Sequence, residues 1–134
     1  MTVYLLDTNV VSEMAKRRPN ARVSAWLSAT PDCYLSVLTV GELIRGIEKL
    51  RSKDPARADK LGSWVRTLRR DYSGRVLDVD EDVVDQWALP PHDRTLPVID
   101  ALIAATAKAH EMTVATRNTK DFEGLGVPTF NPFA

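Results

Sequence analysis

Short apolar runs alternate along the chain with longer stretches in which apolar residues recur at helical spacing. The runs end at polar or turn-forming residues and predict brief strands over residues 3–6, 34–38, 75–79, 112–116 and 127–130. The stretches between them predict helices from Val10 to Met14, Val23 to Leu27, Thr39 to Leu50, Ala58 to Leu68, Val83 to Trp87 and Val98 to His110. Strands that alternate with helices favour an α/β fold, with a parallel sheet covered on both faces. In such folds, function gathers beyond the carboxyl ends of the strands.

The start of the third predicted helix carries a capping pattern. Thr39-Val40-Gly41-Glu42 fits a capping box, in which Glu42 reaches back to the Thr39 amide. A side chain in a first turn can also point past the end of the helix into a crevice. Capping and function therefore both remain open for Glu42.

Three further carboxylates lie where strands end or helices begin. Asp7 terminates the first apolar run, Asp100 lies in the first turn of an alanine-rich helix, and Asp121 follows the fourth predicted strand. Each has a structural alternative: a turn or helix cap for Asp7, the helix dipole for Asp100, and loop solvation for Asp121. Asn118, in the same loop as Asp121, is a second oxygen donor. Together with Glu42, these residues fall on the side of the sheet where the crevice is expected.

This set of carboxylates predicts a bound metal. Crowded carboxylates repel one another and are costly unless a divalent cation neutralises them. An all-oxygen donor set without a histidine or cysteine cluster points to Mg²⁺ or Mn²⁺ and not to zinc. Such a site can activate a water molecule and stabilise charge on a phosphodiester.

The composition argues against several other functions. The 18 basic and 18 acidic residues give a formal net charge of zero, so charge alone does not indicate nucleic-acid binding. The six glycines are scattered and form no phosphate loop, and the two histidines offer little for a nucleophilic triad. Cys33 is the only cysteine, which rules out an intrachain disulfide. There is no secretory signal or membrane-length apolar run, so we expect one cytoplasmic domain over residues 1–134.

Two other doubly wound classes of α/β protein fit the sequence poorly. A phosphotransferase of the haloacid dehalogenase type needs a second aspartate two residues after Asp7, where this chain has Asn9. A phospho-receiver domain needs a lysine after a late strand, where this chain has Arg117. We therefore favour a metal-dependent hydrolase.

Four motifs carry a family resemblance: LLDTNVVS at 5–12, LTVGEL at 38–43, PVIDALIAATA at 97–107 and VATRNTKDF at 114–122. In this order and spacing they resemble the PIN-domain ribonucleases, above all the VapC-type toxins of bacterial toxin–antitoxin pairs. The resemblance runs from Val3 to the C-terminus and implies a three-layer α/β/α PIN-like fold with a central, mostly parallel sheet of four to five strands. One departure is the proline-rich segment between Trp87 and Pro97, which is short for the family.

The resemblance also implies site residues. Asp7, Glu42 and Asp100 match the first three acidic positions of the family, and Asp121 matches the fourth, although in some members that acid falls where Asn118 stands here. We therefore expect Asp7, Glu42, Asp100 and Asp121 to be catalytic, Asp7, Asp100 and Asp121 to bind Mg²⁺ or Mn²⁺, and Asn9, Thr116 and Asn118 to support them.

The implied function is that of the toxin of a type II toxin–antitoxin system. Such a protein is an endoribonuclease that hydrolyses RNA phosphodiester bonds, assembles as a homodimer or larger complex, and is neutralised by a VapB-type antitoxin. The alternative is a catalytically inactive PIN-like module that binds RNA or protein. Separately, the helices predicted over residues 39–68 carry more apolar positions than a helix pair needs internally, which predicts self-association through them.

Overall fold

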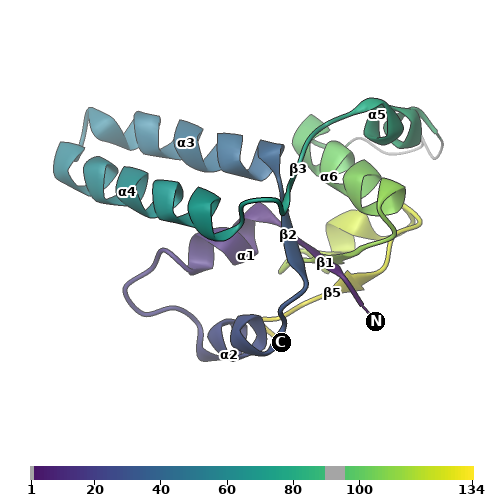
Figure 1. The fold of residues 1–134 in the computed structure, drawn as a ribbon, viewed down its shortest axis with the longest axis horizontal. Coiled ribbons are helices and arrows are strands. Elements are labelled where there is room, and N and C mark those ends of the chain that lie inside the picture. Colours follow the sequence, from purple (N-terminus) through teal and green to yellow (C-terminus); the bar gives the residue numbers. More distant parts are fainter. Residues whose placement is uncertain (1, 90–95) are drawn as a thin grey trace.

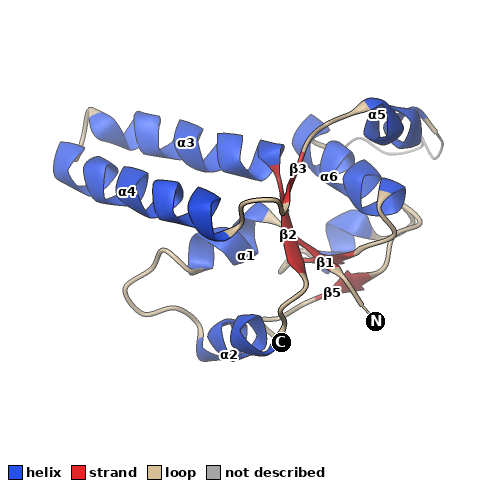
Figure 2. Cartoon of the chain, in the orientation of Figure 1, coloured by secondary structure: helices blue, strands red, loops and turns tan. Residues whose placement is uncertain are grey.

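A five-stranded sheet forms the centre of the fold (Figures 1 and 2). The computed structural model describes residues 2–89 and 96–134. Within these ranges the strand order is β3-β2-β1-β4-β5, and every neighbouring pair is parallel. The strands are β1 (Tyr4–Leu6), β2 (Cys33–Ser36), β3 (Val76–Leu77), β4 (Thr113–Ala115) and β5 (Thr129–Phe130). The predicted strands are confirmed, each trimmed at one end or both.

The helices between the strands begin at polar residues in most cases. They are α1 (Thr8–Glu13), α2 (Ala21–Ala29), α3 (Val37–Arg51), α4 (Pro55–Asp71), α5 (Glu81–Ala88), α6 (Val98–Ala109) and the short 3₁₀ helix η1 (Thr119–Phe122). A side-chain oxygen accepts a hydrogen bond from a backbone amide of the first turn at Asp7, Asn20, Ser36, Asp54 and Asp80. These caps satisfy amides that have no partner within the helix, and so they fix where α1 to α5 begin.

Alternate strand residues enter two separate cores. Leu6, Leu35 and Ala115 pack with side chains from α1 to α4, whereas Leu5 and Val114 pack with side chains from α6 and η1. Successive side chains of a strand point to opposite faces of its sheet, so α1 to α4 cover one face and α6 covers the other. Helix α5 packs on α6. The predicted three-layer α/β/α fold is therefore confirmed.

The order of the strands places a crevice beside β1. From β1 the chain first adds β2 and β3 on one side, and then crosses over to add β4 and β5 on the other. Leu6 pairs with Ala115, so β1 and β4 end at the same level. A switch of this kind separates the connections that leave the two strands and opens a crevice at their carboxyl ends. Asp7 and Thr116 follow these two strands directly.

The α3–α4 pair uses its apolar surface within the molecule. Ile47, Val65 and Leu68 are buried, and Trp64 packs half-buried against the same core. Leu43, Leu50 and Leu61 are only half-buried, so self-association through these helices stays a prediction. Most of the large exposed apolar side chains lie instead on α5 and around the segment that leads to α6: Val84, Trp87, Leu89 and Val98.

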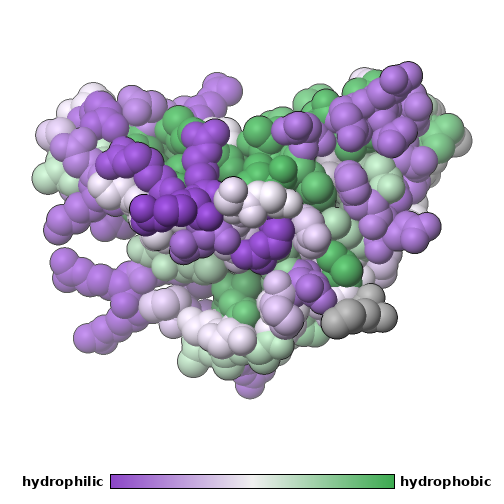
Figure 3. Space-filling model, in the orientation of Figure 1, coloured by the Kyte–Doolittle hydropathy of each residue, from purple (hydrophilic) through white to green (hydrophobic). Residues whose placement is uncertain are grey.

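The outer surface of the α3–α4 pair is largely hydrophilic. Figure 3 shows long hydrophilic side chains projecting from this arm and hydrophobic surface gathered between it and α5–α6.

Among the described residues, no helix has the length and apolar character needed to cross a membrane. Most of the proline-rich departure noted above, residues 90–95, lies outside the described residues.

Candidate active site

Asp7 occupies the crevice beside β1. It is 6% exposed, and its backbone amide donates to the carbonyl oxygen of Ala115 at 2.9 Å, which ties it to the end of β4. Thr116, the next residue after β4, is fully buried. A buried carboxylate at this position needs hydrogen bonds or a cation, because an unpaired charge is costly away from water.

Both oxygens of the Asp7 carboxylate accept hydrogen bonds. Oδ1 accepts from the Thr8 amide at 2.8 Å, which makes Asp7 the N-cap of α1. Oδ2 accepts from the Thr116 hydroxyl at 2.8 Å and from the Asn9 amide group at 3.3 Å. The helix cap and the crevice carboxylate, which the sequence left as alternatives, are therefore one side chain with two sets of contacts.

The loop after β4 completes this network. The Asn9 side chain donates to Thr116 Oγ1 at 3.2 Å, and its Oδ1 accepts from the backbone amide of Arg117 at 3.1 Å. The Asn118 amide donates to Thr116 Oγ1 at 3.0 Å. Asn9 and Thr116 thus contact Asp7 directly, as expected of supporting residues. Asn118 joins the network through its backbone, not through the side-chain oxygen considered as a ligand.

Glu42 reaches the site from α3, and of its two alternatives the capping box is excluded. Ser36 is the N-cap: its hydroxyl accepts from the Leu38 amide at 3.1 Å, and the helix begins before Thr39. Glu42 therefore lies beyond the first turn and caps nothing. Its Oε1 instead accepts a hydrogen bond from the hydroxyl of Thr8 at 2.5 Å.

Asp100 and Asp121 complete the acidic set. Asp100 lies half-buried in the first turn of α6, and Asp121 lies exposed in η1. Burial raises the pKa of Asp100, and the negative charges of Asp7, Glu42 and Asp121 raise it further. The four predicted residues therefore lie within electrostatic reach of one another. They come from four different places in the chain.

Burial and neighbouring negative charges also raise the pKa of Asp7. Burial is the largest influence and raises its pKa, and the charges of Glu42 and Asp121 add to the rise. Hydrogen bonds from Thr116 and Thr8 act in the opposite direction, because they stabilise the charged form. The site thus holds an anionic cluster at some cost in free energy.

Comparison with known proteins decides the family. The family model described as the PIN domain matches residues 4–127. The chain belongs to the PIN-domain family. It is 40% identical to Toxin FitB of Neisseria gonorrhoeae, with 98% of this chain and 99% of that protein covered. It is 36% identical to a VapC ribonuclease of Sinorhizobium fredii, with 98% of each covered.

Solved structures agree with this assignment. The structure of FitAB bound to a DNA fragment matches with a TM-score of 0.81 and 38% identity, over 98% of this chain and 96% of that one. The crystal structure of FitAcB from Neisseria gonorrhoeae matches with a TM-score of 0.78 and 39% identity, over 98% and 99% of the two chains. The PIN-domain fold and VapC-type kinship expected from the sequence are confirmed.

One contact of the PIN-domain site escaped the sequence analysis. Thr8 was not expected to belong to the site, whereas its hydroxyl binds Glu42 and its amide binds Asp7. A polar residue directly after a strand-terminal aspartate was the available signal. Its partner on α3 is 34 positions away and could not be read from local pattern.

The donor set of this PIN domain fits Mg²⁺ or Mn²⁺. All the candidate ligands are hard carboxylate oxygens, and the mutual repulsion that raises the pKa of Asp7 and Asp100 is what a divalent cation relieves. Among the described residues, no three acidic, histidine or cysteine side chains already lie close enough to hold an ion. That arrangement is compatible with Mg²⁺, which often binds through one or two carboxylates and keeps several waters.

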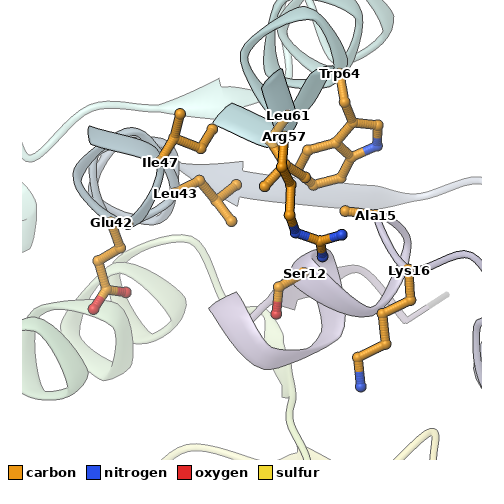
Figure 4. Close-up of a pocket in the computed structure, with 10 residues that line it drawn as sticks. Ser12, Ala15, Lys16, Glu42, Leu43, Ile47, Arg57, Leu61 and Trp64 are labelled. Carbon is orange, nitrogen blue, oxygen red and sulfur yellow. The ribbon is translucent and has the colours of Figure 1, made fainter. Parts of the chain in front are cut away.

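A pocket of about 300 Å³ lies between α1 and the α3–α4 pair, and Glu42 is the site carboxylate that lines it (Figure 4). Its lining is mainly apolar, with Leu43, Leu61 and Trp64 contributing. Glu42 stands at one end of the pocket in Figure 4, and the Arg57 guanidinium extends toward α1 across it. The pocket is therefore a hydrophobic recess that continues from the catalytic candidate Glu42.

Proposed function

We propose that this PIN-domain protein is a Mg²⁺- or Mn²⁺-dependent endoribonuclease and the toxin of a type II toxin–antitoxin system. The observation that carries the proposal is the buried Asp7 carboxylate, fixed by Thr116 and Asn9 at the switch point of the sheet. In addition to burial, the charges of Glu42 and Asp121 raise the pKa of Asp7 and of Asp100. Relatives named as a toxin and a VapC ribonuclease, aligned over almost the whole chain, support the same function.

The acidic residues and the residues that orient them have separate proposed roles. Asp7, Asp100 and Asp121 would hold the ion, which when bound supplies a Lewis acid for the phosphate and lowers the pKa of water. Thr116 and Asn9 keep Asp7 in one orientation, so the ligand is in place before substrate arrives. Thr8 engages Oε1 of Glu42, and the Glu42 carboxylate would accept a proton from the attacking water.

The proposed function also includes binding to an antitoxin and to further copies of the chain. A VapB-type antitoxin places an apolar segment in the recess lined by Leu43, Leu61 and Trp64, and an arginine beside Glu42 and Asp7. Arginine suits this position because its planar group engages two carboxylate oxygens and does not deprotonate. The protein acts in the cytoplasm as a homodimer or a larger assembly. Light scattering of the purified chain measures the oligomeric state directly.

The decisive experiment is cleavage of short labelled RNAs by purified protein freed of antitoxin. Mg²⁺ or Mn²⁺ should support cleavage, whereas EDTA or replacement by Ca²⁺ should suppress it, because Ca²⁺ binds with longer and looser geometry. Asp71→Asn is the matched control, since Asp71 is an exposed acid at the end of α4. RNA binding without cleavage in any metal would instead support the inactive PIN-like module.

A further inference from the structure

The C-terminal segment contacts the loop that carries the site. The ring of Phe133 lies beneath the guanidinium of Arg117, with 3.9 Å between Arg117 Cζ and the ring centroid. Phe133 is half-buried against the core of the α1–α4 face. Its backbone amide donates to Asn131 Oδ1 at 2.9 Å, so a local turn fixes the position of the ring. The ring is thus a fixed platform for a cation.

Arg117 is the link between this platform and the carboxylates. It stands between Thr116 and Asn118, and its amide donates to Asn9 Oδ1 at 3.1 Å. With that oxygen engaged, the amino group of Asn9 faces Asp7 and Thr116. A shift of the Arg117 backbone would remove the bond that orients Asn9, and a flipped amide would turn its oxygen toward the Asp7 carboxylate.

A buried carboxylate holds Arg117 from the other side. Glu13, at the end of α1, is 5% exposed although it is charged. It accepts from the Asn20 amide at 2.8 Å, pairs with Lys16 at 2.8 Å, and lies 4.0 Å from the Arg117 guanidinium. The Lys16 hydrogen bond, followed by that of Asn20, lowers the pKa of Glu13, so it stays ionised at neutral pH. Arg117 is therefore held between an aromatic face and a fixed negative charge.

We propose that Phe133 and Glu13 are positioning residues that act through Arg117. They hold the backbone after β4 so that Asn9 and Thr116 stay on Asp7. The inference rests on the proposed nuclease function for its kinetic consequence, but its structural part can be measured without it. Because the Arg117 guanidinium is already engaged, this role is expected to affect the chemical step and not the affinity for RNA.

The test compares Phe133→Leu with Phe133→Tyr in the full chain. Leucine keeps apolar bulk but has no aromatic face, whereas tyrosine keeps the face. Phe133→Leu should lower kcat between about tenfold and about a hundredfold with KM within about twofold, since small displacements of catalytic groups have effects of this size. Phe133→Tyr should match the wild type. Arg117→Lys, which keeps the charge, should lose less activity than Arg117→Ala.

Amide hydrogen exchange at Arg117 supplies a readout that does not depend on activity. The amide should exchange faster in Phe133→Leu and in Glu13→Gln than in wild type or Phe133→Tyr, because its bond to Asn9 is weakened. Equal exchange in the leucine and tyrosine variants, or a rise in KM with kcat unchanged, would overturn the proposal. If the wild type cleaves no RNA, the nuclease function fails, while the exchange comparison still decides the role of Phe133.

Discussion

The hydroxyl of Thr8 donates to Oε1 of Glu42 at 2.5 Å, joining the start of α1 to α3 across the mouth of the crevice. The amide of the same Thr8 donates to Asp7. One residue therefore orients two of the candidate catalytic carboxylates. Because these carboxylates come from separate helices, their spacing depends on this contact as well as on the packing of α1 against α3.

Removal of the Thr8 hydroxyl should impair catalysis without unfolding the protein. Thr8→Val keeps the shape of the side chain and the backbone bond to Asp7, but it frees Glu42 to rotate. We expect kcat to fall roughly tenfold, in the range for a misplaced catalytic group, while Thr8→Ser remains active. Single-turnover cleavage rates measure the effect. Equal rates for the valine and serine variants would show that Glu42 needs no such anchor.

Neutralising Asp7 should abolish cleavage while leaving the fold intact. Asn at this position can still accept the Thr8 amide bond as an N-cap, but it loses the charge that binds the metal. We expect a rate loss of at least about a hundredfold, because several kcal/mol of charge stabilisation depend on the ion. Thermal unfolding of Asp7→Asn in EDTA should show unchanged or higher stability. Asp71→Asn should behave as wild type in both measurements.

Metal-free protein should become more stable as pH falls moderately. Burial and neighbouring charges raise the pKa of Asp7 and Asp100, so the folded state binds these protons more tightly than the unfolded state. Their stabilising contribution is complete below the ordinary aspartate value of 3.8 and is lost as pH rises through the folded-state pKa. The free energy of unfolding in EDTA should therefore increase as the pH falls from neutral through the folded-state pKa of Asp7 and Asp100.

Glu13 contributes a pH dependence of the opposite sign. The pKa of Glu13 is lowered, so its contribution is present above the ordinary value of 4.5 and is lost only as pH falls through its folded-state pKa. It does not mask the trend at higher pH. Asp7→Asn should flatten the pH dependence, and so should saturating Mg²⁺. A free energy of unfolding that falls in EDTA as the pH is lowered from neutral, at values still above 4.5, would contradict the electrostatics derived for the site.

Cys33 should be chemically inert in the folded protein. Its side chain is buried in β2, its Sγ donates to the Thr30 carbonyl, and burial raises its pKa to about 11. The thiolate is the reactive form, so a thiol reagent should label native protein slowly and unfolded protein fast. Rapid labelling under native conditions would mean that β2 opens readily.

Antitoxin binding should respond to the metal and to Glu42. If an arginine of the antitoxin occupies the carboxylate cluster, Mg²⁺ should weaken the complex, and Glu42→Gln should lower affinity at least about tenfold. Trp64→Ala should weaken binding in every metal condition, because it reshapes the apolar recess. Calorimetric titration with the cognate antitoxin measures all three. Affinity insensitive to Mg²⁺ and to Glu42 would place inhibition elsewhere.

The sequence located the strands and the acidic positions because both follow from local pattern. An aspartate that ends an apolar run is visible without a structure, and Asp7 was found in this way. The start of α3 was misjudged because Ser36 and Thr39 are both competent caps, and the apolar residues between them extended the apparent strand. In the structure Ser36 caps the helix, and Thr39 is buried inside its first turn.

Contacts between distant segments could not be predicted in the same way. Glu13 looks like an ordinary charged residue on a short helix, and only the fold brings Arg117 and the Asn20 amide to it. The surplus of apolar positions on α3 and α4 indicated an external surface, whereas the structure buries Ile47, Val65 and Leu68 and leaves Leu43, Leu61 and Trp64 half-buried around the recess. Periodicity identifies an apolar face, but not the element that covers it.

The strand order also affects when the protein can become active during synthesis. Asp7 is translated 109 positions before Thr116, whose hydroxyl orients it, and well before β4, the strand that flanks it. A growing chain can fold α3 against α4 long before the central strand has both neighbours, because local contacts form before distant ones. An unfinished chain therefore lacks a complete site. A protein built in this way cannot cut the message that encodes it, or other RNA nearby, until its chain has been made beyond Thr116.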